Sequence, residues 1–298
     1  MLHNSNVIIC MALKYSFQDV EIFLKSLSIA GYKEELIIIS DLDFENLAFE
    51  YRITSIKLAE IDNSFKGSLN KTFSRIVYNT FLRKLVLKLL FHLKFSLFSK
   101  IYNHFSHIYL NRFNLYINIL KDVNYKNIFI TDLRDVFFLK SPFSASSYIP
   151  LTFFGENDKL ELRNEPYNSM WINTIYGSKG IKNIGNNIIY NMGTILGSKK
   201  EVEKFMRDIL YESIKHKFFD ANSSQDQGIL NYLISTKKWP LSKKSKNAEI
   251  VFTVGTINED EIKVDGNDII YKNKKIDSSV VHQYDRKPNL IKYAQRFR

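Results

Sequence analysis

The opening of the chain alternates between strand-like and helix-like patterns, and this constrains its fold more than any other feature. Residues 6–12 and 35–40 are short apolar runs typical of buried strands. Between them, apolar residues recur at helical spacing: Val20, Phe23, Leu24 and Leu27. Gly31 ends the predicted helix. Two parallel strands need a helical crossover, so the pattern predicts a βαβ unit and an α/β fold with a mixed, mainly parallel central sheet.

A later apolar strand pattern ends in acidic residues. Residues 127–139 read Asn-Ile-Phe-Ile-Thr-Asp-Leu-Arg-Asp-Val-Phe-Phe-Leu, so a buried strand runs directly into Asp132 and Asp135. Open α/β sheets bind ligands at the carboxyl ends of their strands, and carboxylate oxygens suit Mg²⁺ or Mn²⁺. In isolation, such a pair more often marks a polar strand end or the N-cap of a turn. Its position after so apolar a strand favours a metal site that holds a diphosphate.

The composition permits a full hydrophobic core and argues against several classes of protein. The chain has 298 residues, 45% hydrophobic content and a single cysteine, Cys10, which excludes an intramolecular disulfide framework. The first residues lack the features of a signal peptide, and no charge-free apolar run reaches the roughly 20 residues of a spanning helix. The sequence contains no internal repeat or low-complexity linker. We therefore expect one domain, residues 1–298, in the cytoplasm.

Nearly all of the net charge of +11 lies in one segment. Residues 63–121 contain no Asp or Glu but ten basic residues: Lys66, Lys71, Arg75, Arg83, Lys84, Lys88, Lys94, Lys100, Arg112 and Lys121. Within this segment, residues 82–102 carry basic or polar side chains at steps of four and apolar side chains over the remaining surface. This pattern predicts one amphipathic helix with a basic stripe, within a basic helical insertion at residues 65–108.

Three interpretations of the basic segment are open. It is a solvated charged face on a core-packed helix, a nucleic-acid-binding surface, or a helix at a membrane surface. Nucleic-acid-binding proteins normally carry a recognisable motif, and none occurs here, so we expect no nucleic acid as a partner. A membrane-surface helix fits better, because anionic headgroups attract each Lys or Arg by about 1 kcal/mol. We expect peripheral association with the inner face of an anionic membrane.

A histidine follows the last strand-like run, residues 278–281. A neutral imidazole at His282 can complete a metal site begun by two carboxylates, and Lys287 can contact a phosphate as a point charge. A lone histidine at a strand end is more often structural. The cluster of Arg286, Lys287 and Pro288 beside it favours a site. We expect residues 278–298 to close a binding site from the C-terminal end.

Two further segments carry candidate residues whose role is open between function and structure. In residues 191–197, Gly193 and Gly197 either permit close backbone approach to a ligand or mark a bulge. Asp226 orients a hydroxyl, stabilises positive charge at a reacting sugar carbon, or only caps a helix that begins at a capping box, residues 224–227. Residues 156–185 are polar and contain glycines, which predicts a substrate-facing loop region around Trp171.

Four segments in this order resemble the landmarks of GT-A nucleotide-sugar glycosyltransferases. They are Thr131-Asp-Leu-Arg-Asp-Val-Phe-Phe, Tyr190-Asn-Met-Gly-Thr-Ile-Leu-Gly, Asp226-Gln-Gly-Ile-Leu-Asn and Val280-Val-His-Gln-Tyr-Asp-Arg. No single motif is specific, but four in the right order are, and the resemblance spans most of the chain. It implies a single GT-A (Rossmann-like) domain, similar to the family-eight transferases. The implied activity moves a sugar from a nucleotide donor, a UDP sugar, to a glycan or lipid-linked glycan acceptor in surface polysaccharide synthesis.

The resemblance also implies roles for individual residues. The implied ligands of Mn²⁺ or Mg²⁺ are Asp132, Asp135 and His282. The implied donor-binding residues are Ala12, Tyr15, Asp132, Arg134, Gly193, Arg286 and Lys287. The implied catalytic residues are Asp226, Gln227 and Asn191. The acidic motif is D-x-x-D where the family has D-x-D, so Asp135 is the preferred ligand, and Asp132 is either a ligand or a ribose contact.

Two other functions compete with glycosyl transfer. A haloacid-dehalogenase-like phosphatase also places an aspartate at a strand end, but that family needs D-x-D, and Arg134 occupies the place of its second acid. The alternative that stays open is a non-catalytic adaptor on a degenerate transferase fold, which binds membranes or nucleic acid through the basic segment.

Overall fold

The computed structural model describes residues 5–44, 47–58, 80–143, 149–216 and 225–298. Its central sheet has seven strands: β1 (Val7–Ala12), β2 (Glu35–Ser40), β3 (Arg52–Ile56), β4 (Asn127–Thr131), β6 (Thr152–Glu161), β7 (Ile188–Ser198) and β8 (Lys243–Ser245). They lie in the order β3-β2-β1-β4-β7-β6-β8. All neighbours are parallel except β7, which runs antiparallel to both β4 and β6. The predicted α/β class with a mixed, mainly parallel sheet is confirmed.

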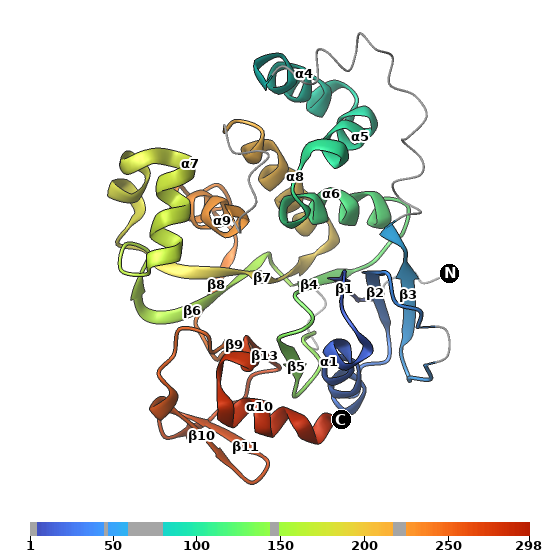
Figure 1. The fold of residues 1–298 in the computed structure, drawn as a ribbon, viewed down its shortest axis with the longest axis vertical. Helices are drawn as coiled ribbons and strands as arrows, with labels where there is room; N and C mark the ends of the chain where they lie inside the picture. The colour runs from blue at the N-terminus through green and yellow to red at the C-terminus, as the bar shows by residue number, and fades with distance from the viewer. Residues whose placement is uncertain (1–4, 45–46, 59–79, 144–148, 217–224) are drawn as a thin grey trace.

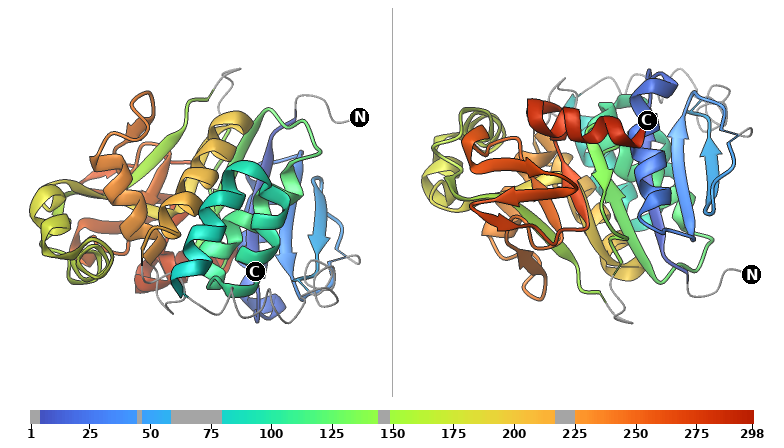
Figure 2. Two further views of the ribbon diagram at one scale, coloured as in Figure 1. Left: turned by 90° about the horizontal axis from the view of Figure 1, so that it is seen from above. Right: turned by 90° about the horizontal axis from the view of Figure 1, so that it is seen from below.

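Helices cover both faces of this sheet. The α-helices of the described residues are α1 (Phe17–Ile29), α4 (Thr80–Leu93), α5 (Phe95–Phe105), α6 (Ile108–Leu120), α7 (Pro166–Ile184), α8 (Lys199–Ser213), α9 (Gln225–Ser235) and α10 (Pro288–Ala294). In Figure 1 the sheet crosses the middle of the molecule, with α4, α5, α6, α8 and α9 above it and α1 and α10 below it. Figure 2 shows these two layers from above and from below.

Alternation along the strands divides the core between the two faces. Ile9, Ile37 and Ile130 belong to a buried cluster with side chains from α6, α8 and α9. Their strand neighbours Cys10 and Phe129 belong to a second cluster with side chains from α1. Successive strand residues point to opposite faces, so strands buried on both sides need continuous apolar sequence. The N-terminal βαβ unit is confirmed, with β1 and β2 parallel over their whole length.

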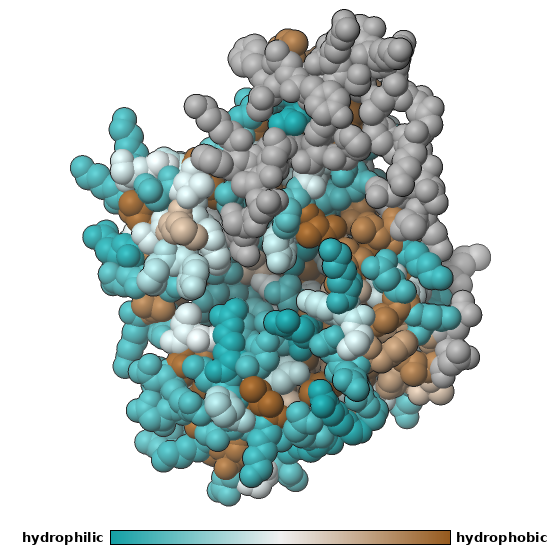
Figure 3. All heavy atoms as spheres, in the orientation of Figure 1, coloured by the Kyte–Doolittle hydropathy of each residue, from teal (hydrophilic) through white to brown (hydrophobic). Residues whose placement is uncertain are grey.

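A second, smaller layer of strands holds the C-terminal part against the sheet. Its three strands are β5 (Val136–Phe138), β13 (Val280–His282) and β9 (Val251–Thr253), in the order β5-β13-β9. A hairpin is formed by β10 (Ile262–Asp265) and β11 (Asp268–Tyr271), and β12 (Lys274–Lys275) pairs with β11. Gly266 turns the hairpin with φ of 54°, a conformation that favours glycine. The face of the molecule over this hairpin is mainly hydrophilic (Figure 3).

Two predictions about local structure are wrong. The predicted single helix over residues 82–102 is two helices, α4 and α5, with a break at Lys94, whose φ of −149° is not helical. Residues 156–185, predicted as a loop region, form the end of β6 and the whole of α7. Glu165 caps the N-terminus of α7, because its carboxylate accepts hydrogen bonds from the backbone N–H groups of the first turn, and Pro166 is the first helical residue. The polar composition of this segment reflects an exposed helix rather than a loop.

Some predictions fall outside the described residues. These are residues 65–79 of the basic insertion, with Lys66, Lys71 and Arg75, and Ser224 of the predicted capping box. Among the helices of the described residues, none has the length and apolar character needed to cross a bilayer.

Candidate functional site

The order of the central strands creates a crevice at the carboxyl ends of β1 and β4. The chain leads from β1 to β2 and β3 on one side, whereas β4 lies on the other side of β1. Such a change of direction leaves a ligand-binding crevice in open α/β sheets. Asp132 directly follows β4, and its backbone N–H donates to the carbonyl oxygen of Gly193 in β7, at 2.7 Å. The neighbouring strand therefore fixes where this acidic residue lies.

Asp132, Asp135 and His282 meet at this crevice and form what we call the metal cluster. One ligand atom from each lies within 4.8 Å of the others. Strand β13 pairs with β5 so that His282 lies opposite Val136, the residue after Asp135. Residues 150 positions apart in the sequence are thereby brought together, as the sequence predicted. His282 Nε2 is 3.7 Å from Asp132 Oδ2 and 3.9 Å from Asp135 Oδ2.

The metal cluster fits a divalent cation. Ligands about 2.1 Å from one ion lie roughly 3 to 4 Å apart, which matches the distances from His282 to the two carboxylates. His282 Nε2 is buried and has no hydrogen-bond partner among the described residues. Its other nitrogen, Nδ1, lies 3.3 Å from Thr253 Oγ1, and donation there leaves the Nε2 lone pair facing the acids. Two carboxylates and a neutral imidazole are a ligand set that Mn²⁺ and Mg²⁺ accept.

The electrostatics of the metal cluster depend on its burial. Burial raises the pKa of the Asp132 carboxyl, but His282 and Arg112 outweigh it and hold that pKa well below its ordinary value. Burial raises the pKa of Asp135, and the favourable charge of His282 does not fully offset this. Burial alone lowers the pKa of His282, whereas the neighbouring carboxylates produce a net increase. Without metal, a proton on His282 therefore offsets part of the carboxylate charge, and a cation bound at the cluster would take its place.

A buried arginine links the metal cluster to Asp226. Arg112 of α6 donates to Asp132 Oδ1 at 2.9 Å, to Asp226 Oδ2 at 2.8 Å and to the carbonyl oxygen of Met192 at 3.2 Å. Arg112 and Asp226 are 8% and 3% exposed, so this ion pair is shielded from solvent. Burial raises the pKa of Asp226, and Arg112 opposes that increase. The guanidinium holds two acids from separate elements at one edge of the crevice.

Gly193 leaves the space that the metal cluster occupies. A Cβ atom at this position would lie 2.4 Å from Asp132 Oδ2 and 2.7 Å from His282 Nε2. Neither side chain can retreat easily, because Arg112 holds Asp132 and β13 holds His282. No sequence pattern predicts that this glycine faces the metal ligands themselves.

We expect Gly193→Ala to reduce Mn²⁺ affinity at least about tenfold, because it displaces two ligands. Calorimetric titration with Mn²⁺ measures this change. The matched control is Gly155→Ala in the adjacent strand β6, where a Cβ would meet its nearest neighbour at 3.5 Å, an ordinary contact. Equal Mn²⁺ affinities of the two variants would contradict the placement of the metal site.

A cleft of about 490 Å³ opens above the metal cluster. One wall comes from the sheet edge, with Asp132, Asp135 and Gly193, and the other comes from α7, with Tyr167 and Trp171. The rings of these two aromatic residues have centroids 6.1 Å apart. The volume lies in the range of about 300–1,000 Å³ that small-molecule sites occupy.

Of the predicted catalytic residues, two line the cleft and one lies beneath it. Asp226 and Gln227 are part of the lining. Gln227 donates to Glu156 Oε1 at 2.9 Å and to Asn168 Oδ1 at 3.1 Å, and so joins α9 to β6 and α7. Asn191 is fully buried, and its amide donates to the Phe154 carbonyl oxygen at 3.0 Å and to Thr253 Oγ1 at 3.2 Å. It therefore supports the threonine that contacts His282.

Some of the predicted donor-binding residues line the cleft and others do not. Arg286 lines the cleft, as does Gly193. Tyr15 is half-buried after β1, and its pKa is raised by burial and by nearby Asp132 and Asp135, with Arg134 opposing.

Tyr15 does not line the cleft, and neither do three other predicted donor-binding residues. Ala12 is fully buried at the end of β1. Arg134 pairs with Asp285 at 3.3 Å at the surface, and the ammonium of Lys287 donates to the carbonyl oxygen of Ile257. That hydrogen bond uses one of the three N–H donors of the ammonium.

Several lining residues were not identified from the sequence. Arg112 was counted only as part of the basic segment, although it is the single charged residue in residues 108–120, and an isolated charge on an apolar helix is a usable signal. Glu156 is 4% exposed, and burial raises the pKa of its carboxyl, with His282 opposing. Gln283 adopts a left-handed conformation with φ of 62°, and its N–H donates to the Asp135 carbonyl oxygen at 2.7 Å. No sequence pattern identifies this residue.

The chain matches no protein-family profile, and it matches no curated protein. Homology therefore assigns it no family and no function, and its resemblance to the GT-A transferases stays an interpretation of four motifs. The chemistry of the site is instead given by a cation-fitting cluster, a buried arginine and a cleft with acidic, basic and aromatic walls.

Proposed function

We propose that this protein is a metal-dependent glycosyltransferase that moves a sugar from a uridine diphosphate donor to a glycan or lipid-linked glycan. The observation that carries the proposal is the metal cluster, Asp132, Asp135 and His282, at the crevice between β1 and β4. A divalent cation at such a crevice is suited to a diphosphate, because it offers both charge and coordination positions for phosphate oxygens.

A GT-A architecture is part of the proposal. Its support is the convergence of four landmarks that are separated along the chain. Asp132, Gly193, Asp226 and Arg286, one from each landmark, all line the same cleft. Four short motifs that occurred by chance would have no reason to line one cleft. The central β4-β7 pair contributes two of them, because Asp132 and Gly193 lie side by side across these strands.

The residues in and around the metal cluster have separate roles in the proposed reaction. Mn²⁺ or Mg²⁺ would be held by the metal cluster and would act as a Lewis acid toward the diphosphate leaving group. Arg286 lies in the cleft and adds fixed positive charge on the same side. Asp226 presents a carboxylate to the cleft, positioned by Arg112, where it opposes positive charge at the sugar carbon.

The opposite wall is suited to carbohydrate. Trp171 and Tyr167 of α7 provide apolar ring faces, whereas Glu156 and Glu165 provide hydrogen-bond acceptors. Sugars present both hydroxyl groups and apolar C–H faces, so a wall that combines rings with carboxylates suits them. We assign this wall to the acceptor. Gln227 lies between the two walls and holds Glu156 in place.

Incubation of the protein with Mn²⁺ and a panel of nucleotide sugars tests the proposal. The expected result is release of uridine diphosphate that needs Mn²⁺ and stops with a chelator. Calorimetric titration of uridine diphosphate with and without Mn²⁺ tests binding apart from turnover. Absence of metal-dependent binding and turnover with every donor would overturn the proposal and favour a non-catalytic adaptor.

A further inference from the structure

Helix α4 carries a row of exposed leucines, which we call the leucine stripe. Its members and their exposed fractions are Leu82 (39%), Leu85 (58%), Leu89 (58%) and Leu93 (74%). They are spaced three or four residues apart, so they lie on one face of the helix along about 16 Å. The opposite face contains the buried residues Arg83 and Leu87. Leucines therefore occupy the outer side of α4.

The leucine stripe lies on the outermost helix of its layer. Helix α4 packs on α5, α5 packs on α6, and α6 packs on α8 (Figure 1). Ile29 and Leu241, by contrast, are exposed apolar residues with no other exposed large apolar residue three or four positions away. A continuous exposed stripe is different, because such patches mark surfaces that bind a protein or a membrane.

The surroundings of the leucine stripe are positively charged. Lys88 is half-buried on its flank, and Lys94 and Lys100 are exposed just beyond it. No acidic residue occurs in residues 63–121 to neutralise these lysines. The charge is therefore of one sign along the whole of α4 and α5.

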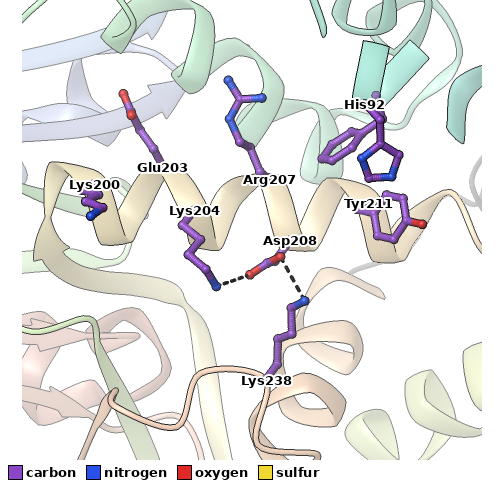
Figure 4. Close-up of a pocket in the computed structure, with 9 residues that line it drawn as sticks. His92, Lys200, Glu203, Lys204, Arg207, Asp208, Tyr211 and Lys238 are labelled. Atoms are coloured by element: carbon purple, nitrogen blue, oxygen red, sulfur yellow. Dashed lines mark hydrogen bonds and ion pairs between the residues drawn. The ribbon is translucent and has the colours of Figure 1, made fainter. Parts of the chain in front are cut away.

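A cleft of about 470 Å³ lies where His92 of α4, the residue before Leu93, is next to Tyr211 of α8 (Figure 4). Its cationic side chains are Lys200, Lys204, Arg207 and Lys238, and its acidic ones are Glu203 and Asp208. Asp208 pairs with both Lys204, at 3.1 Å, and Lys238, at 3.3 Å. The guanidinium carbon of Arg207 lies over the ring of Phe95, 3.8 Å from its centroid. This cleft extends the positive surface from α4 onto α8.

We propose that the leucine stripe and its flanking lysines form a docking surface for an anionic lipid bilayer. The leucines would enter the boundary between headgroups and acyl chains, and the lysines would lie at the level of the lipid phosphates. A second copy of the chain is a poorer occupant, because two surfaces of the same strong charge repel each other. A helical ridge needs a groove in a protein partner, whereas a bilayer accepts it directly.

Flotation with lipid vesicles tests this docking surface, and it does not depend on the proposed enzymatic function. The two probes are vesicles of phosphatidylcholine alone and vesicles with one quarter phosphatidylglycerol. We expect at least about tenfold stronger partitioning to the anionic vesicles. The variant Leu85→Ser with Leu89→Ser should lose about tenfold or more, because both side chains are exposed and enter the boundary region. Lys88→Gln with Lys94→Gln and Lys100→Gln should lose about tenfold to a hundredfold.

The matched control is Ile29→Ser with Leu241→Ser, two exposed apolar residues outside the leucine stripe, which should bind like the unmodified protein. Leu89→Trp gives an independent measurement. The tryptophan emission of this variant should shift to shorter wavelength with anionic vesicles only. Equal partitioning to both vesicle types, or binding unaffected by the leucine and lysine variants, would overturn the proposal. So would a lipid-free dimer that Leu85→Ser with Leu89→Ser dissociates, because a second copy would then occupy the stripe.

Discussion

Replacing Asp135 by alanine is expected to lower the affinity for uridine diphosphate in the presence of Mn²⁺ at least about 100-fold, and turnover with it. Asp135 contributes one of three protein ligands of the metal cluster, and its carboxylate lies 3.9 Å from His282 Nε2. Removal leaves Asp132 and His282, which offer one carboxylate instead of two to the cation. Calorimetric titration of uridine diphosphate with Mn²⁺ present measures the loss.

The same substitution should not destabilise the fold in the absence of metal. Burial raises the pKa of Asp135, which means that its ionised form is disfavoured at this position. Removing it should therefore leave the thermal midpoint without metal unchanged or slightly higher. Mn²⁺ should raise the midpoint of the unmodified protein but not that of the variant, because the ion stabilises only the form that binds it.

Asp122→Ala is the control for Asp135→Ala. Asp122 has an 82% exposed side chain and a distant ion pair with Lys121 at 3.7 Å. It carries the same charge as Asp135 but lies outside the metal cluster, so its loss should change neither metal-dependent binding nor stability measurably. Equal effects of the two substitutions would mean that net charge, rather than ligation at this site, determines binding.

Replacing Arg112 by methionine should destabilise the protein by about 3–5 kcal/mol, which is the largest effect that we expect on folding. The guanidinium is the charged partner of Asp226, which is 3% exposed, and it also binds Asp132. Without it, a buried carboxylate loses its counter-ion and its charged hydrogen bond. Urea unfolding at neutral pH measures the change in the free energy of unfolding.

Two further variants distinguish the loss of the buried ion pair between Arg112 and Asp226 from the loss of packing around Arg112. Arg112→Met combined with Asp226→Asn removes both charges of the buried pair and should recover part of the lost stability. Arg163→Met removes an arginine whose side chain is 45% exposed and whose ion pair with Glu161 is 3.9 Å long, so it should cost less than about 1 kcal/mol. A cost for Arg112→Met as small as that for Arg163→Met would show that the buried pair contributes little.

The sheet was predictable because its signals are local. Strands β1, β2 and β4 are buried on both faces and therefore appear as continuous apolar runs, and the crossover helix α1 has helical spacing between two of them. Helix α7 was not predicted because its sequence shows no clear amphipathic pattern. In addition, Gly177, with φ of 70°, bends the helix. Local composition there resembles that of a loop.

The basic helices show why the direction of a helix face could not be predicted. The spacing of lysines and leucines between residues 82 and 102 predicts an amphipathic helix but cannot say which face packs inward. Because the helix breaks at Lys94, the apolar positions of α4 and those of α5 do not continue along one helix face. Leu85 and Leu89 face outward in α4, whereas Phe98 is buried in α5.

The metal cluster was predictable to the extent that its members end strands. Asp132, Asp135 and His282 each interrupt or follow an apolar run, and the carboxyl ends of strands are natural ligand sites. The role of Arg112 depends on tertiary packing, because α6 must lie across β4 and β7 before its guanidinium reaches Asp226. Contacts of this kind between distant segments leave no periodic trace in the sequence.

Anomalous diffraction from a crystal grown with Mn²⁺ and uridine diphosphate tests the central claim most directly. The predicted result is one strong manganese peak about 2.0–2.3 Å from a carboxylate oxygen of Asp135 and from His282 Nε2, with diphosphate oxygens completing the coordination. A manganese peak outside the metal cluster, or a nucleotide bound without manganese at these residues, would contradict the account.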